Sequence, residues 1–255
     1  MPRYRLTLEY DGTDFVGWQR QATGRSIQQQ LEEAIARFAG GPVSVIAAGR
    51  TDAGVHATGQ VVHVDLQKPL PPFRVMEATN FHLKPEPIAV LAAVEVPDSF
   101  HARFDAVERR YRYRILNRRP PPVLARNRVW HVQHALAVPA MQEAASLLEG
   151  RHDFTSFRAA LCQAKSPVKT LTRLTVREAA DGPEGEEVWV EATAPSFLHH
   201  QVRNLVGTLV EVGLGRWQPT RMTSILAARN RSAAGQTAPA AGLTFLAVRY
   251  PGEEG

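Results

Sequence analysis

Cysteine, lysine and long apolar runs are scarce in this chain of 255 residues. Cys162 is the only cysteine, which excludes a disulfide within the chain and is typical of proteins in a reducing cytoplasm. No apolar run reaches the roughly 18 residues that a membrane-spanning helix needs. The N-terminus also lacks the apolar segment of a signal peptide. We therefore expect a soluble, cytoplasmic protein with no membrane partner.

Lysine accounts for only four of the 30 basic residues, so the positive charge is carried almost entirely by arginine. The formal net charge of +5 indicates a polyanionic partner. Arginine forms bidentate hydrogen bonds with phosphates and stacks on bases, so a nucleic acid is the favoured polyanionic partner. A codon bias toward arginine would explain the same excess. The length and the 44% hydrophobic content suffice for one large core or two modest ones.

A short hairpin with an unusually long loop is the most informative stretch. Residues 43–48 and 60–66 are short apolar runs of the kind that form strands, and glycines interrupt the segment between them. A loop of about eleven residues exceeds the roughly two to five of a common hairpin, and such long loops usually carry a function. We therefore expect the functional residues of this chain to lie in this loop.

Arg50 and Asp52 lie two residues apart in this loop. An aspartate is ionised at neutral pH, and a nearby guanidinium favours that form. Asp52 is therefore a candidate nucleophile. The alternative is that Thr51, Asp52 and Gly54 only stabilise a turn through side-chain hydrogen bonds.

The rest of the first half predicts a sheet with two helices. Tyr4, Leu6, Leu8 and Tyr10 alternate with polar residues, as in a strand, and Ser26 with Gln29 resembles a capping box that starts a helix. Between them, residues 11–25 combine Phe15 and Trp18 with Arg20 and Arg25. That combination suits single-stranded nucleic acid, although the aromatic rings could equally plug a loop. A helix through residues 75–81 and a strand at 88–96 complete the order β-α-β-β-α-β.

The second half repeats this order with one extra short helix. It starts with a strand in which Tyr111, Tyr113 and Ile115 face one way and Arg110, Arg112 and Arg114 the other. Further strands are predicted at 170–178, 188–193 and 243–250, and helices at 138–149, from residue 199 to about 213, and at 220–229. We predict an α+β protein built of two ferredoxin-like halves side by side, residues 1–105 and 106–255, with a catalytic cleft between them.

The sequence GRTDAGVHA, which contains Arg50 and Asp52, resembles the catalytic motif of the TruA-type tRNA pseudouridine synthases. LEYDGTDFVGWQRQ, SFHARFDAVERRYRYRIL, EGRHDFTSF, FLHHQVRNLVGTLVEVGLGR and TAPAAGLTFLAVRYP resemble further blocks of that family in the same order. His200 and Gln201 depart from the family pattern, but at no catalytic position. The resemblance implies the pseudouridine synthase fold and isomerisation of uridine to pseudouridine in the tRNA anticodon stem-loop, at positions 38, 39 and 40, without cofactor or metal.

The resemblance also implies roles for individual residues. Asp52 would act as the nucleophile, Arg203 would orient it through an ion pair, and Tyr111 would lie against the uracil. Without the resemblance, Arg203 would be an ordinary surface arginine and Tyr111 a core residue. The predicted substrate-binding residues are Tyr111, Arg50, Arg203, His56, Arg110 and Arg112. The family further implies a symmetric homodimer with an RNA lying across both subunits.

Two other functions remain possible from the residues alone. A non-catalytic RNA-binding protein would use a sheet with exposed aromatic and basic residues. A metal-dependent nuclease would use Asp52 with His56 and His63, which flank the loop. The sequence has no His-Glu-x-x-His motif and no cysteine pair, so we expect no metal site.

Overall fold

The computed structural model describes residues 1–160, 162–179 and 186–253, and its fold is α+β, as predicted. Its contacts concentrate in two units, Met1–Val107 with Thr244–Gly255 and Glu108–Leu243. The last strand thus groups with the first unit, whereas the sequence assigned it to the second half. None of the described helices is both long enough and apolar enough to cross a lipid bilayer.

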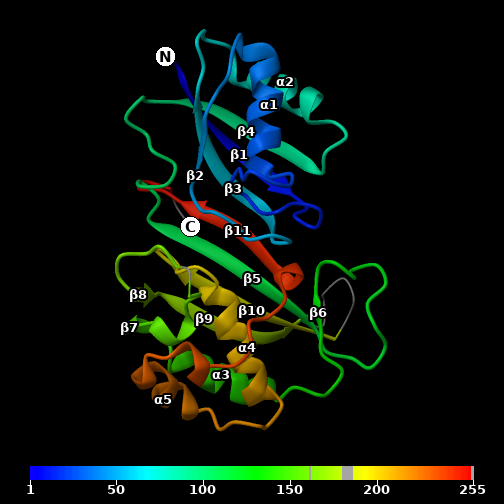
Figure 1. The fold of residues 1–255 in the computed structure, drawn as a ribbon, viewed down its shortest axis with the longest axis vertical. Coiled ribbons are helices and arrows are strands. Elements are labelled where there is room, and N and C mark those ends of the chain that lie inside the picture. Colours follow the sequence, from blue (N-terminus) through cyan, green and yellow to red (C-terminus); the bar gives the residue numbers. More distant parts are fainter. Residues whose placement is uncertain (161, 180–185, 254–255) are drawn as a thin grey trace. The chain divides into compact units, whose positions relative to one another are not determined.

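The first unit is a sheet with two helices (Figure 1). The sheet has the strand order β4-β1-β3-β11, and β2 pairs with β3; every pairing is antiparallel except that of β3 with β11. Helices α1 and α2 pack on each other, and α2 packs on β4. The elements are β1 (Arg3–Tyr10), α1 (Ile27–Ala39), β2 (Val45–Ala47), β3 (His56–Asp65), α2 (Pro72–Leu83), β4 (Ile88–Val96) and β11 (Leu243–Arg249).

The local patterns that predicted β1 and α1 are confirmed. The alternation in β1 buries the predicted tyrosine and leucine face, whose four side chains are at most 4% exposed. Helix α1 starts after Ser26, whose side chain accepts a hydrogen bond from the backbone N of Gln29 at 3.2 Å. It ends at Gly40, which has a φ of 81° in the left-handed region that glycine adopts without a Cβ clash.

Strand β3 begins at His56, four residues before the start predicted from the sequence. Gly59 suggested a break in the chain, but it lies inside the strand. A Cβ atom at this position would lie 2.2 Å from the carbonyl oxygen of Leu246 on β11. Gly59 is therefore needed for the close approach of β11, and the loop that carries Asp52 is shorter than predicted.

Phe15 and Trp18 are only 4% and 2% exposed, so the prediction that they stack on nucleic-acid bases is wrong. They plug the loop of residues 11–25, which was the alternative. The guanidinium of Arg25 lies 5.3 Å from the centroid of the Phe15 ring and pairs with Glu86. The two aromatic rings and the Arg25 guanidinium therefore stabilise the loop.

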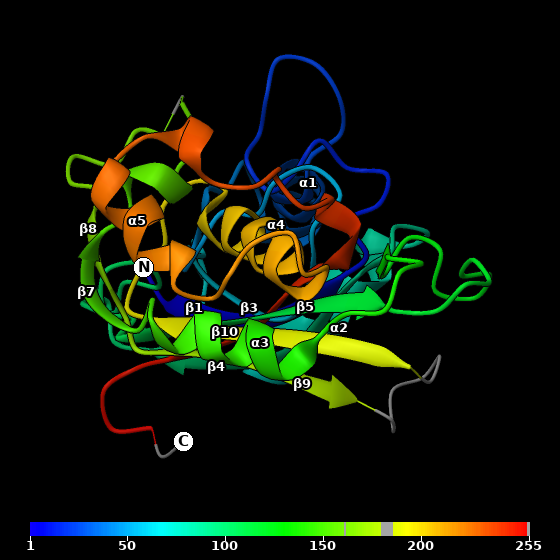
Figure 2. The same cartoon turned by 90° about the horizontal axis from the view of Figure 1, so that it is seen from below.

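The second unit contains a three-stranded antiparallel sheet in the order β5-β10-β9, with β6 pairing in parallel with β5 (Figures 1 and 2). Strands β7 and β8 form a separate two-stranded antiparallel sheet. The sequence predicted neither β6 nor β7, and its strand at 170–178 is divided between β8 and β9. The elements are β5 (Glu108–Leu116), β6 (Trp130–His131), α3 (Val138–Ser146), β7 (Gly150–Asp153), β8 (Val168–Leu171), β9 (Arg173–Ala179), β10 (Glu187–Ala194), α4 (Gln201–Gly213) and α5 (Arg221–Ala228).

Helix α4 lies over one face of this sheet (Figures 1 and 2). Every residue of α4 is buried except Arg203 and Glu211, so its burial exceeds the one apolar stripe predicted from the sequence. The side of α4 that does not face the sheet is covered by the segment of residues 231–238. A Cβ atom at Gly207 would lie 1.8 Å from the carbonyl oxygen of Gln236, so this contact requires glycine.

The alternation predicted for β5 is confirmed. Tyr111, Tyr113 and Ile115 are at most 8% exposed, while the three arginines between and before them face the other side of the sheet. The outer edge of β9 is closed by α3, because side chains of Gln142 and Glu149 accept hydrogen bonds from its backbone N–H groups. This sheet therefore has a buried face, a protected edge and an open face.

Candidate active site

The backbone around Asp52 is fixed from both sides. Asp52 forms an isolated antiparallel bridge with Gly17, and the backbone N of Trp18 donates to the carbonyl of Thr51 at 2.9 Å. The backbone N of Val55 donates to the carbonyl of Asp52 at 3.1 Å and closes the turn. The position of the Asp52 side chain is therefore set by backbone hydrogen bonds to a segment more than thirty residues earlier in the chain.

Two glycines make this contact possible. A Cβ atom at Gly12 would lie 2.0 Å from the carbonyl oxygen of Val55, and one at Gly17 would lie 2.8 Å from that of Thr51. Gly17 also has a φ of 109°, which L-residues with side chains rarely adopt. The loop of residues 11–25 therefore fits directly against the Asp52 loop and holds it in place.

Tyr10 and Gln60 support the Asp52 loop from the sheet. The hydroxyl of Tyr10 lies 2.8 Å from Oγ1 of Thr51, and Nε2 of Gln60 donates to the carbonyl of Gly49 at 2.8 Å. Burial raises the pKa of Tyr10 to about 12, so its hydroxyl stays protonated at neutral pH. The sequence identified Tyr10 only as a core residue, because its alternation pattern carries no information about the hydroxyl.

The three predicted residues on this loop and its following strand differ in exposure. Asp52 is partly exposed, whereas Arg50 is exposed and forms no ion pair with a carboxylate in the described part of the chain. His56 is 7% exposed; its Nδ1 accepts a hydrogen bond from the backbone N of Gly12 and lies 3.1 Å from a carboxylate oxygen of Asp11. Asp52 therefore combines a fixed backbone with partial exposure, and His56 stabilises the turn beside it.

Tyr111 lies on the buried face of β5 in the second unit. It is 8% exposed, sits opposite Ala192 on β10, and meets the ring of Phe197 edge-on at 5.2 Å. Arg110 and Arg112 lie on the other face of the same sheet. The predicted substrate-binding set is therefore divided, because one RNA nucleotide cannot contact both faces.

Arg203 is held by the segment that covers α4. Its Nε donates to the carbonyl of Ala238 at 2.8 Å, and the backbone N of Ala238 donates back to the carbonyl of Arg203 at 3.1 Å. The side chains of Arg231 and Thr237 both donate to Oδ1 of the neighbouring Asn204. This polar network fixes the direction in which Arg203 leaves the helix, and the sequence gave no sign of it because its members lie up to 35 residues apart.

The constellation proposed for a metal-dependent nuclease does not form. His63 lies on β3, and its Nδ1 accepts a hydrogen bond from the backbone N of Ala102 at 3.1 Å. The ligand atoms of Asp52, His56 and His63, all of them described residues, do not come together around one position. Both histidines are buried: His56 directly follows the loop, as predicted, and His63 lies seven residues further along β3.

The burial of His63 makes the stability of the protein depend on pH. Burial, with the nearby charge of Arg3 as a smaller cause, lowers the pKa of His63 from 6.5 to about 4. Between these two pH values, His63 is therefore mostly protonated in the unfolded chain and mostly neutral in the folded chain. We expect the free energy of unfolding to fall as the pH drops from about 6.5 toward 4.

Urea unfolding of the wild type and of His63→Gln across this range measures the effect. Glutamine keeps an acceptor for the Ala102 N–H but does not titrate, so the stability of the variant should depend less on pH. Other groups titrate equally in both proteins and cancel in the difference. Parallel stability curves for the two proteins would contradict the prediction.

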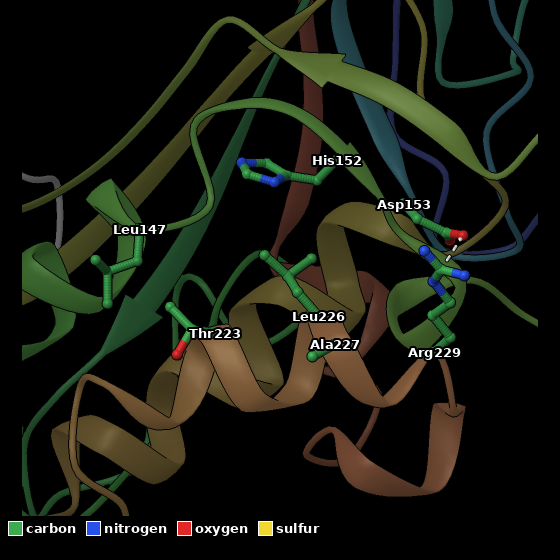
Figure 3. Close-up of a pocket in the computed structure, with 7 residues that line it drawn as sticks. All are labelled: Leu147, His152, Asp153, Thr223, Leu226, Ala227 and Arg229. Carbon is green, nitrogen blue, oxygen red and sulfur yellow. Dashed lines mark ion pairs between the residues drawn. The ribbon is translucent and has the colours of Figure 1, made fainter.

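A pocket of about 510 Å³ lies between α5, the end of α3 and β7 (Figure 3). Its polar groups are already engaged: Asp153 accepts hydrogen bonds from Thr155, which hold its pKa below the usual range, and its other oxygen lies 3.4 Å from Nε of Arg229. None of the predicted site residues lines this pocket. We therefore do not assign the reaction to it.

Comparison with known proteins identifies the family. A family profile described as tRNA pseudouridine synthase matches residues 7–105 and 144–251. The tRNA pseudouridine synthase A of Rhodospirillum centenum is 60% identical over 250 residues, which cover 98% of this chain and 100% of the relative. The enzyme of the same name from Rhodospirillum rubrum is 58% identical over 253 residues, covering 99% of this chain and 89% of the relative. On this evidence, the chain belongs to the tRNA pseudouridine synthase family.

Proposed function

We propose that this protein isomerises uridine to pseudouridine in the anticodon stem-loop of tRNA, at positions 38, 39 and 40, with Asp52 as the nucleophile. The observation that carries the proposal is the Asp52 loop, in which a partly exposed carboxylate is held by backbone hydrogen bonds and two close glycine contacts. A turn that served only as a connection would not need these supports. Family membership favours an enzyme over the non-catalytic RNA-binding protein that the sequence left open.

The chemistry requires a carboxylate to start it and a group that accepts the C5 proton. The N1–C1′ bond breaks, the uracil turns, a C5–C1′ bond forms, and the C5 proton leaves while N1 regains a proton. Asp52 starts the reaction either by attacking C1′ or by removing a sugar proton to give a glycal. Substrate and product are isomers, so the reaction has no net redox change and calls for no cofactor.

The target base must leave the RNA stack before Asp52 can reach the sugar, which costs a few kcal/mol. We assign this work to Tyr111, which would stack on the uracil, and to Arg50, which would occupy the vacated space or contact phosphate. The exposure of Arg50 suits either role. Arg203 would orient the Asp52 carboxylate, and its hydrogen bond to Ala238 supports a fixed geometry for that task.

The direct test is pseudouridine mapping in tRNA transcripts incubated with the purified protein. We expect new pseudouridines at positions 38 to 40 only, an unchanged RNA length, and the same yield in EDTA. Transcripts that carry cytidine at those three positions are the control. Modification elsewhere, or no modification at all, would contradict the proposed function.

We expect tRNA binding to weaken steeply with salt. Arginine contacts to phosphates release condensed counterions, so a plot of log affinity against log salt concentration should have a slope of about −0.9 for each phosphate contact. Filter binding between low and physiological salt concentrations measures this slope. A flat plot would remove tRNA as the substrate.

A symmetric homodimer is part of the proposal. Twofold dimers are the commonest soluble assembly, and a pair of subunits offers a longer surface to one tRNA than a single subunit does. Sedimentation at micromolar protein should give twice the mass of the 28.1 kDa chain. A monomeric mass would overturn this part of the proposal without affecting the reaction.

A further inference from the structure

The open face of the second unit's sheet carries a block of arginines that the proposed reaction does not use. The strand register places the residues of this face in four rows, each running from β5 across β10 to β9. One row, Leu116, Glu187 and Ala179, is buried. The other three rows are Arg114, Trp189 and Arg177; Arg112, Glu191 and Thr175; and Arg110, Thr193 and Arg173.

Two of these arginines are neutralised on the sheet itself. Arg112 pairs with Glu191 and Arg114 with the buried Glu187, each at 2.6 Å. Two guanidinium groups lie against the Trp189 ring, that of Arg112 at 3.8 Å and that of Arg177 at 4.5 Å from its centroid. Arginines of the sheet itself therefore already occupy the ring on which a base would have to stack.

The other three arginines supply the charge of this face. Arg110, Arg173 and Arg177 are exposed and form no ion pair with any carboxylate among the described residues. Five arginines and three glutamates, among them Glu108 at the start of β5, leave this face with a charge of +2. Three exposed guanidinium groups on a rigid sheet suit several phosphates along one backbone.

The charge decides which partner fits. In a twofold contact between copies of this chain the face would meet itself, which would bring the unpaired arginines of both copies together. A polyanion is instead attracted by the same charge. Since two arginines already contact the Trp189 ring, the binding of a polyanion here depends on phosphates and not on stacked bases.

We propose that this open face binds the phosphate backbone of a tRNA segment outside the anticodon stem-loop. The inference rests on the proposed function, in which the target uracil stacks on Tyr111. Tyr111 and the arginines lie on opposite faces of one sheet, and α3 closes the edge at β9. The RNA on the open face is therefore a different segment from the one that carries the target nucleotide.

The test compares tRNA binding by the wild type and by Arg173→Gln/Arg177→Gln. We expect affinity for full-length tRNA to fall on the order of tenfold at low salt and the slope of log affinity against log salt to decrease by about two. Affinity for an isolated anticodon stem-loop should stay unchanged. Arg173→Lys/Arg177→Lys should retain most of the affinity, because a phosphate also accepts a point charge.

The matched control is Arg37→Gln/Arg74→Gln, which removes the same charge from exposed positions on α1 and α2. It should leave the salt slope closer to that of the wild type. Equal losses in both double variants, equal losses for both RNAs, or unchanged binding of full-length tRNA would overturn the inference. So would a change of mass in sedimentation without a change in tRNA binding, which would make this face a contact between copies. Failure of the proposed function is distinguishable, because wild-type protein would then form no pseudouridine.

Discussion

Asp52→Asn is expected to abolish pseudouridine formation while tRNA affinity stays within a few fold of the wild type. Asparagine has the shape of aspartate but cannot attack C1′ or remove a proton from the sugar. Loss of a nucleophile lowers turnover by about 10⁴-fold or more in well-studied enzymes. The supports of this loop are backbone contacts from Gly17, Trp18 and Val55, so the exchange leaves them in place.

Tritium release from tRNA labelled at uridine C5 measures the turnover of Asp52→Asn. The matched control is Asp14→Asn, the same chemical change at an exposed aspartate in the loop of residues 11–25. It should retain wild-type turnover. If Asp52→Asn keeps a tenth of the wild-type rate while the control is fully active, Asp52 is not the nucleophile.

Tyr111→Phe is expected to bind tRNA normally and to lose on the order of a hundredfold or more in rate, the usual contribution of a positioned acid or base. The C5 proton must be removed, and in the proposed reaction Asp52 already acts on the sugar. The hydroxyl of Tyr111 would then take the proton directly or through one water. Tyr111→Leu should additionally lose the stacking of the uracil, which contributes roughly 1 to 3 kcal/mol.

Single-turnover rates at saturating enzyme separate the hydroxyl from the ring. Tyr113→Phe is the matched control, because Tyr113 lies two residues along the same face and its hydroxyl donates to the carbonyl of Pro239 at 2.7 Å. That exchange should cost about 1 kcal/mol of stability and little activity. A fully active Tyr111→Phe variant would show that Tyr111 only holds the base.

Much of the fold follows from short-range patterns. The alternation in β1 and β5, the cap of α1 at Ser26 and the apolar stripe of α4 each depend on residues within one or two turns or strand steps. The sequence also singled out the Asp52 loop, because its length and composition exceed what a hairpin requires. Such features can be predicted because their physical causes are local.

The predictions that the structure contradicts concern contacts between segments that are far apart in the sequence. Gly59 continues a strand because β11, almost 190 residues later, approaches it too closely for a side chain. Phe15 and Trp18 are buried because their loop packs against the Asp52 loop. Arg112 is neutralised by Glu191 on a neighbouring strand, so the sequence overstated the charge of its face.

The sequence by itself therefore led to the proposal of Asp52, Arg203 and Tyr111 for the chemistry and determined the local elements that hold them. Tertiary structure decided how each residue is placed: the backbone bridge from Gly17 fixes Asp52, the carbonyl of Ala238 holds Arg203, and alternate residues of β5 put Tyr111 and Arg110 on opposite faces. The physical reason is that hydrogen bonds, burial and ion pairs join residues that are adjacent in space, and in the first two of these contacts the partner is about 35 residues away along the chain.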